Sequence, residues 1–120
     1  WLDLVALKHA IDVNGIDELV LTKLDVLSGL DKIGLCVGYK LGNKVFKQFP
    51  NDASVLEKCR PVYKYYKGWQ QDISGLRSFN QLPQAAQAYV KSLEKILQIP
   101  FAILSVGPSR DQNIWLKTDF

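Results

Sequence analysis

The segment Leu19-Val20-Leu21-Thr22-Lys23-Leu24-Asp25 is the stretch from which the arrangement of the chain is best worked out. The apolar density from Glu18 to Lys23 favours a strand that is buried on both faces, as in the centre of an α/β sheet. Along an extended segment, Lys23 and Asp25 point to the same side and Leu24 points into the core. The stretch therefore predicts a strand end that exposes a charged pair and is anchored by Leu24.

This charged pair has the chemistry needed to read the edge of a guanine base. Guanine carries adjacent N1–H and N2–H₂ donors, and the carboxylate of Asp25 offers two acceptor oxygens at matching spacing. The methylene stem of Lys23 can lie along the flat face of the base while its ammonium stays in water. A Lys-x-Asp sequence at a strand end is also typical of a solvated corner, so the motif alone leaves both interpretations open.

A second strand end has complementary chemistry, at Ser105-Val106-Gly107. Ligands of open α/β sheets bind at the carboxyl ends of strands, where the connecting loops diverge. Gly107 lets the backbone come close to a flat ligand, and N–H groups near Ser105 and Gly107 can donate to an acceptor such as guanine O6. We expect the two loops to read both halves of the guanine edge, with an ordinary Gly-Pro turn as the alternative for the second loop.

Capping residues and hydrophobic periodicity predict helices on either side of the strands. Asp3 is suited to cap a helix that Asn14-Gly15 ends, and an apolar stripe predicts a second helix that begins at Pro83 and is ended by Pro100. Gly42-Asn43 is a plausible tight hairpin turn. The further predicted strands are Ile33–Leu41, Val45–Phe49, Val62–Tyr66, Phe101–Ser105 and an edge strand at Ile114–Leu116. The expected fold class is α/β, a fragment of a mixed sheet flanked by helices, with an antiparallel hairpin.

The composition is that of a soluble globular chain. With 120 residues, 48% hydrophobic and 22% charged, the chain can form one domain with a core. No apolar run approaches the roughly 18 residues of a membrane-spanning helix, and the net charge of +3 is mild, with scattered lysines. We therefore expect neither a membrane nor a nucleic acid as a partner.

The residue types that carry most catalytic and metal chemistry are sparse. His9 is the single histidine, and Cys36 and Cys59 have no Cys or His neighbours at the spacing of metal ligands. No Gly-rich phosphate loop and no Ser-His-Asp set occurs. The sequence predicts no catalytic residue and no metal ligand in this chain, and two unpaired thiols favour a reduced, cytoplasmic protein.

Several short motifs follow one another in a distinctive order. They are Trp1-Leu2-Asp3, Asn14-Gly15-Ile16-Asp17, Leu21-Thr22-Lys23-Leu24-Asp25-Val26-Leu27, Cys36-Val37-Gly38-Tyr39, Pro61-Val62-Tyr63, Gly68-Trp69, Leu82-Pro83 and Ser105-Val106-Gly107-Pro108. Each motif is weak by itself. The ordered series, which covers essentially the whole chain, resembles the C-terminal part of the adenylosuccinate synthetase family.

The resemblance implies a GTP-dependent ligase of purine biosynthesis that joins IMP to L-aspartate, with Mg²⁺ on the phosphates. Carried over by position, Lys23-Leu24-Asp25 resembles the guanine-contacting segment of the family, and Ser105-Val106-Gly107 resembles the second segment of the same pocket. The resemblance also implies that the catalytic residues, the phosphate loop, the Mg²⁺ ligands and the IMP contacts lie upstream of Trp1. Residues 1–120 are then the guanine-recognition region of a longer homodimeric enzyme and are inactive alone.

One residue departs from the resemblance, and two other functions stay open. Ser109 stands where the resemblance leads us to expect an acidic residue in the turn Gly107-Pro108-x-Arg110. The first alternative function is a free-standing guanine-nucleotide-binding regulatory module. The second is a plain α/β interaction domain without a ligand. For either nucleotide-binding function, the affinity of this chain alone should be weak, because phosphate contacts supply most of the binding energy of a triphosphate.

Overall fold

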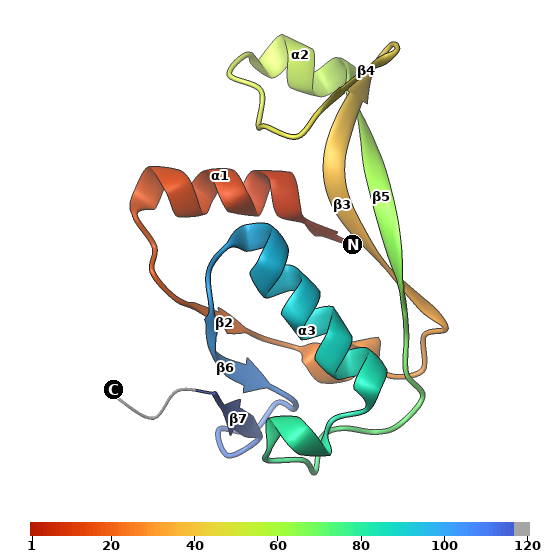
Figure 1. The fold of residues 1–120 in the computed structure, drawn as a ribbon, viewed down its shortest axis with the longest axis vertical. Coiled ribbons are helices and arrows are strands. Elements are labelled where there is room, and N and C mark those ends of the chain that lie inside the picture. The colour runs from red at the N-terminus through yellow and green to blue at the C-terminus, as the bar shows by residue number, and fades with distance from the viewer. Residues whose placement is uncertain (117–120) are drawn as a thin grey trace. The chain divides into compact units, whose positions relative to one another are not determined.

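The computed structural model describes residues 1–116, and the chain forms two compact units (Figure 1). Unit 1 comprises Trp1–Ile16 and Gly34–Tyr65, and unit 2 comprises Asp17–Ile33 and the chain from Tyr66 onward. Among the described residues, no helix has the length and apolar character needed to cross a membrane. The two loops singled out in the sequence both belong to unit 2.

Unit 1 is built around the greater part of β3 (Lys32–Leu41), which has several strand neighbours. β1 pairs in parallel with β3 at Leu35 and Cys36, β4 pairs antiparallel with its far end, and β5 also pairs with it. The other elements of this unit are β1 (Leu2–Asp3), α1 (Leu4–Asn14), β4 (Lys44–Phe46), α2 (Ala53–Lys58) and most of β5 (Arg60–Lys67). The result is a small mixed sheet accompanied by helices.

The helix cap and the hairpin that the sequence predicts in unit 1 are both confirmed. Asp3 caps α1, since its Oδ1 accepts the N–H groups of Val5 and Ala6 at 3.0 and 3.1 Å. Gly15 ends the helix in the left-handed conformation, at φ 62°. Gly42-Asn43 joins β3 to β4 as a two-residue turn, with Leu41 paired to Lys44. These features depend on local chemistry, which is why the sequence reveals them.

Strand β4 is shorter than the predicted Val45–Phe49, because it ends at Phe46. Phe49 has left the strand and packs against the buried cluster of Val5, Cys36 and Tyr39. The chain therefore bends to cover this cluster instead of extending the hairpin.

Unit 2 contains a second sheet, with the order β2-β6-β7 (Figure 1). β2 pairs in parallel with β6, and β7 pairs antiparallel with β6 on its other side. The elements of this unit are β2 (Leu19–Leu21), the 3₁₀ helices η1 (Leu24–Leu27) and η2 (Phe79–Gln81), α3 (Gln84–Leu97), β6 (Phe101–Ser105) and β7 (Asn113–Trp115). β6 is thus the central strand and connects the edge strands.

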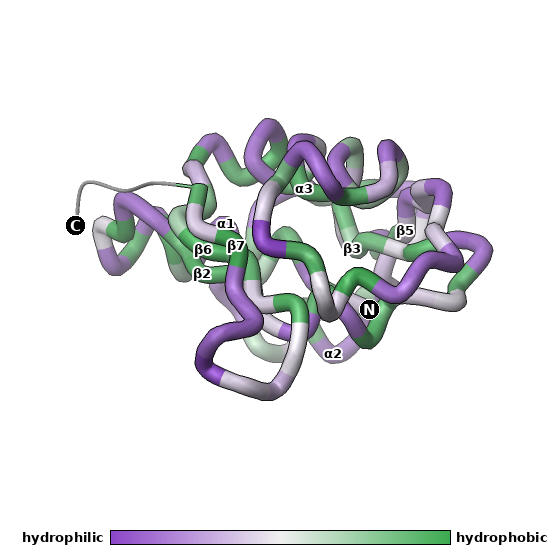
Figure 2. The backbone as a smooth tube through the Cα atoms, turned by 90° about the horizontal axis from the view of Figure 1, so that it is seen from below, coloured by the Kyte–Doolittle hydropathy of each residue, from purple (hydrophilic) through white to green (hydrophobic). Residues whose placement is uncertain are grey.

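Helix α3 lies along this sheet, with its hydrophilic turns facing away from it (Figure 2). Of the predicted apolar stripe, Ala86, Tyr89, Val90, Leu93 and Leu97 are buried and Ile96 is half-buried. The expectation that Pro100 ends the helix is wrong, because Gln98 already turns the chain with a left-handed φ of 57°. Glu94 then accepts the N–H of Phe101 at 2.9 Å, which ties the helix end to the start of β6.

We predict that replacing Asp3 with Ala lowers the free energy of unfolding by about 2 kcal/mol, measured by urea denaturation. About half comes from the lost cap and half from the buried Tyr39 hydroxyl, which donates to Asp3. Asp12→Ala is the control, since Asp12 only forms an exposed ion pair with Lys8 at 3.1 Å. Equal unfolding midpoints for the two variants would contradict this assignment.

Candidate functional site

The two candidate loops leave the same edge of the sheet in unit 2. β2 and β6 are parallel neighbours, with Val20 opposite Ile103 and Leu21 opposite Leu104. The carboxyl ends of parallel neighbours lie at one edge, so the loops that follow Leu21 and Ser105 emerge together. η1, which carries Asp25, also contacts β6. The structure thereby supplies the strand order that the sequence does not contain.

The first loop is not the extended segment that strand alternation predicts. β2 ends at Leu21, and Lys23 turns the chain with a left-handed φ of 59° before η1 begins at Leu24. Leu24 is still the anchor, because its side chain is only 1% exposed. A left-handed non-glycine residue costs on the order of 1 kcal/mol, so the surrounding contacts must hold Lys23 in place.

The charged pair of this loop is accessible. Lys23 is exposed and Asp25 is half-buried at the start of η1. Within residues 1–116, the carboxylate of Asp25 makes no hydrogen bond or ion pair, while its main-chain carbonyl accepts the N–H of Ser28 at 3.1 Å. Asp25 therefore offers two carboxylate oxygens from a short helical turn with a defined backbone.

Trp69 stabilises the end of this turn through two hydrogen bonds. Its indole N–H donates to the hydroxyl of Ser28 at 2.9 Å, and its carbonyl accepts the N–H of Gly29 at 2.8 Å. The ring is 4% exposed and lies 6.0 Å from the ring of Tyr89, at 59°. Residue spacing does not reveal this support, because it joins residues about forty positions apart.

The second loop offers fewer donors than the sequence predicts. The Val106 N–H donates to the carbonyl of Gln112 at 2.8 Å, so it is already engaged. Ser105 ends β6 opposite Asn113, and its hydroxyl donates to the carbonyl of Gly107 at 3.2 Å. Within residues 1–116 the N–H of Gly107 has no hydrogen-bond partner. Gly107 is therefore the residue of this loop with a main-chain donor to spare.

The structure also gives a reason for glycine at position 107. A Cβ atom there would overlap the side-chain amide of Gln112. Sequence reasoning attributes this glycine to the close approach of a ligand, whereas the room left by its missing side chain is filled by Gln112. Ser109, the residue that departs from the resemblance, also contacts Gln112, since its N–H donates to Oε1 at 2.9 Å.

The described residues offer no cluster of side chains that could bind a metal ion. In residues 1–116, no three His, Cys, Asp or Glu side chains gather where they could hold an ion. His9 stacks on Phe49 with the ring centroids 4.9 Å apart, which is a packing arrangement. The residues present therefore do not fit a Mg²⁺ site.

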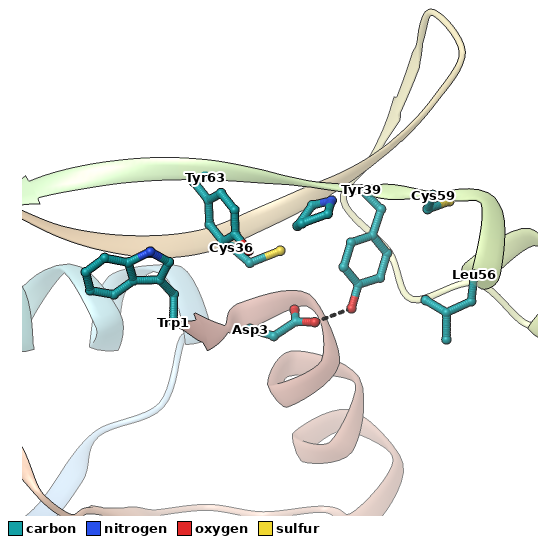
Figure 3. A pocket seen from close by; sticks show the side chains of 8 residues that line it. Trp1, Asp3, Cys36, Tyr39, Leu56, Cys59 and Tyr63 are labelled. Atoms are coloured by element: carbon teal, nitrogen blue, oxygen red, sulfur yellow. Dashed lines mark hydrogen bonds between the residues drawn. The ribbon is translucent and has the colours of Figure 1, made fainter.

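A separate pocket of about 310 Å³ lies in unit 1, lined by aromatic rings and both thiols (Figure 3). Its carboxylate, Asp3, is occupied as the cap of α1 and as the acceptor of the Tyr39 hydroxyl. Burial, and secondarily the charge of Asp3, raises the pKa of the Cys36 thiol. Since a reactive thiol needs a lowered pKa, Cys36 has the character of a packed thiol.

Comparison with known proteins identifies close relatives. The family model for adenylosuccinate synthetase matches residues 1–114 of this chain. The adenylosuccinate synthetases of Geotalea uraniireducens and Aquifex aeolicus are each 48% identical to it, over 100% and 98% of this chain and over 28% and 27% of their own lengths.

A solved structure agrees with these sequence matches. The structure of fully ligated adenylosuccinate synthetase from Plasmodium falciparum superposes with a TM-score of 0.92 at 39% identity, and the match covers 98% of this chain and 28% of that protein. This similarity confirms the predicted α/β class, with mixed sheets flanked by helices. The chain spans a little over a quarter of the length of the relatives that it matches.

We predict that Cys36 of the folded chain resists labelling by an aromatic disulfide reagent at pH 8, whereas the half-buried Cys59 reacts. The raised pKa of Cys36 keeps it protonated, and burial keeps the reagent out. Both thiols should react in denaturant. Labelling followed by mass spectrometry distinguishes them, with Cys59→Ser as the control. Fast labelling of Cys36 in the native chain would contradict its description as a buried, protonated thiol.

Proposed function

Because the chain belongs to the adenylosuccinate synthetase family, we propose that its two strand-end loops hold the guanine base of GTP in an enzyme that joins IMP and L-aspartate. The observation that carries the proposal is the parallel pairing of β2 with β6, which sends both loops from one sheet edge. Within residues 1–116, a carboxylate without a protein partner lies on one loop, and a main-chain donor without one lies on the other.

In this proposal the two loops read opposite parts of the Watson–Crick edge. The carboxylate of Asp25 accepts from guanine N1–H and N2–H₂, and the N–H of Gly107 donates to O6. The stem of Lys23 lies against the base, and Leu24 fixes the turn to the core. Ser105 and Val106 hold the second loop through their own hydrogen bonds. Adenine lacks the adjacent donors for Asp25 and is rejected.

The proposed reaction proceeds in two steps. The 6-oxygen of IMP is first phosphorylated by GTP, which turns it into a good leaving group, and the amine of aspartate then displaces the phosphate to give adenylosuccinate. In this reaction, the part of the enzyme formed by this chain selects the nucleotide. No step is assigned to Mg²⁺ here, because the described residues do not fit a site for it. The C-terminal placement of this region in the enzyme, its homodimeric assembly and its cytoplasmic location stay predictions.

A free-standing guanine-nucleotide-binding regulatory module is the second candidate. It requires the same two loops and the same base chemistry, so the loops alone do not separate the two functions. Turnover and nucleotide selection are therefore tested separately.

Nucleotide selection is tested with Asp25→Asn in the 120-residue chain. GMP and AMP are titrated while the amide signals of residues 23–25 and 105–107 are followed by NMR. We expect GMP, but not AMP, to shift both sets of signals, and Asp25→Asn to weaken GMP binding about tenfold or more, because it loses a charged acceptor and opposes N2–H₂ with an amide donor.

Two features of this experiment make it selective. XMP, which carries an oxygen in place of the 2-amino group, should bind Asp25→Asn better than the unchanged chain, since the Asn amide can donate to that oxygen. Asp17→Asn is the matched control, because Asp17 is an exposed carboxylate of unit 2 outside both loops. If GMP and AMP bind alike, or if Asp25→Asn binds GMP unchanged, the guanine site is disproved.

Turnover is tested by incubating the chain with GTP, IMP, L-aspartate and Mg²⁺. We expect no adenylosuccinate by its ultraviolet absorbance, because residues 1–116 contain neither a metal cluster nor a histidine placed for proton transfer. The full-length enzyme of Geotalea uraniireducens serves as the positive control. Steady formation of product by the chain would contradict the assignment of the chemistry to other parts of the enzyme.

A further inference from the structure

Gln112 organises the connection between β6 and β7 with three hydrogen bonds to two residues. Its carbonyl accepts the Val106 N–H at 2.8 Å, and its own N–H donates to the carbonyl of Ser109 at 3.0 Å. Its side-chain Oε1 accepts the N–H of Ser109 at 2.9 Å. Gln112 therefore stabilises the loop through both its main chain and its side chain.

The side chain of Gln112 also packs against the one loop residue that has no side chain. Its amide group fills the space in which a Cβ of Gly107 would stand. From there Nε2 reaches the carbonyl of Ser74 at 3.4 Å, a longer contact with a segment far away in sequence. The amide is therefore held between the candidate loop and the 72–74 segment, and Gly107 rests on it.

The consequence is that, within residues 1–116, the N–H of Gly107 stays unpartnered beside two engaged N–H groups. Gln112 uses the N–H groups of Val106 and Ser109, on either side of the turn, while the N–H of Gly107 has no partner within residues 1–116. Because Gly107 is buried against the Gln112 amide, the direction of its N–H depends on that amide.

We propose that Gln112 is a positioning residue for the half of the pocket that reads guanine O6: it touches no ligand itself and holds the Gly107 N–H in place. This inference rests on the proposed guanine site. It adds that discrimination at O6 depends on Gln112, whereas discrimination at the 2-amino group depends on Asp25. A purely structural role for Gln112 would instead lower both preferences together.

The test compares three nucleotides on Gln112→Ala, by NMR titration of the 120-residue chain. GMP is the reference, 6-thio-GMP replaces the O6 acceptor with a weaker sulfur, and IMP lacks the 2-amino group. We expect the unchanged chain to prefer GMP over 6-thio-GMP by about threefold to tenfold, the value of one neutral hydrogen bond. In Gln112→Ala this preference should fall to about one, while the preference for GMP over IMP should stay.

Two further variants keep the test decisive if Gln112→Ala does not fold. Gln112→Glu keeps an acceptor for the Ser109 N–H and should retain most of the preference for GMP over 6-thio-GMP. Gln112→Asn is one methylene shorter, cannot span the same contacts and should lose it. Asp111→Ala, at an exposed neighbouring residue, is the matched control and should behave as the unchanged chain.

Each outcome has a separate meaning. If a folded Gln112→Ala or Gln112→Asn keeps the preference for GMP over 6-thio-GMP, the positioning role is overturned. If both preferences fall together, Gln112 is a structural residue only, and the proposal is likewise overturned. If the unchanged chain shows no preference for GMP over AMP or IMP, the guanine site itself fails, and the result says so independently of Gln112.

Discussion

The parallel pairing of β2 with β6 is the constraint on which the candidate site depends. The two strands are separated by most of the chain, yet Leu21 stands opposite Leu104, so their loops leave the sheet together. An antiparallel pairing would send the loop after Leu21 and the loop after Ser105 to opposite edges, and no common site would exist. At the other end of β6, the Phe101 N–H donates to Glu94, which ties the start of this strand to the end of α3.

Each loop is then supported by a buried or half-buried residue that makes polar contacts with both its main chain and its side chain. Trp69 holds the turn after η1 through Ser28 and Gly29, and Gln112 holds the turn after β6. The left-handed backbone of Lys23 costs free energy, and the hydrogen bond from the Val26 N–H to its carbonyl at 3.3 Å helps to hold it. The carboxylate of Asp25 and the N–H of Gly107 have no partner in the part of the chain that the structure describes. They are opposite in hydrogen-bonding character, as a base edge with donors and an acceptor requires.

Local chemistry made much of the fold predictable from the sequence. The Asp3 cap, the Gly42-Asn43 turn and the buried stripe of α3 each depend on residues close together in the chain, and each is confirmed. The predicted end of α3 is wrong, because Gln98 adopts a left-handed conformation that its residue type does not predict. The bend at Lys23 escaped prediction for the same reason. The supports by Trp69 and Gln112 were missed because tertiary packing, not spacing, brings their contacts together.

A crystal structure of the chain soaked with GMP shows whether one guanine base contacts both loops at once. We expect the guanine site to place the Asp25 oxygens within about 3 Å of guanine N1 and N2, and the Gly107 nitrogen within about 3 Å of O6. A base that contacts only one loop, or that lies in the pocket of unit 1, would contradict it.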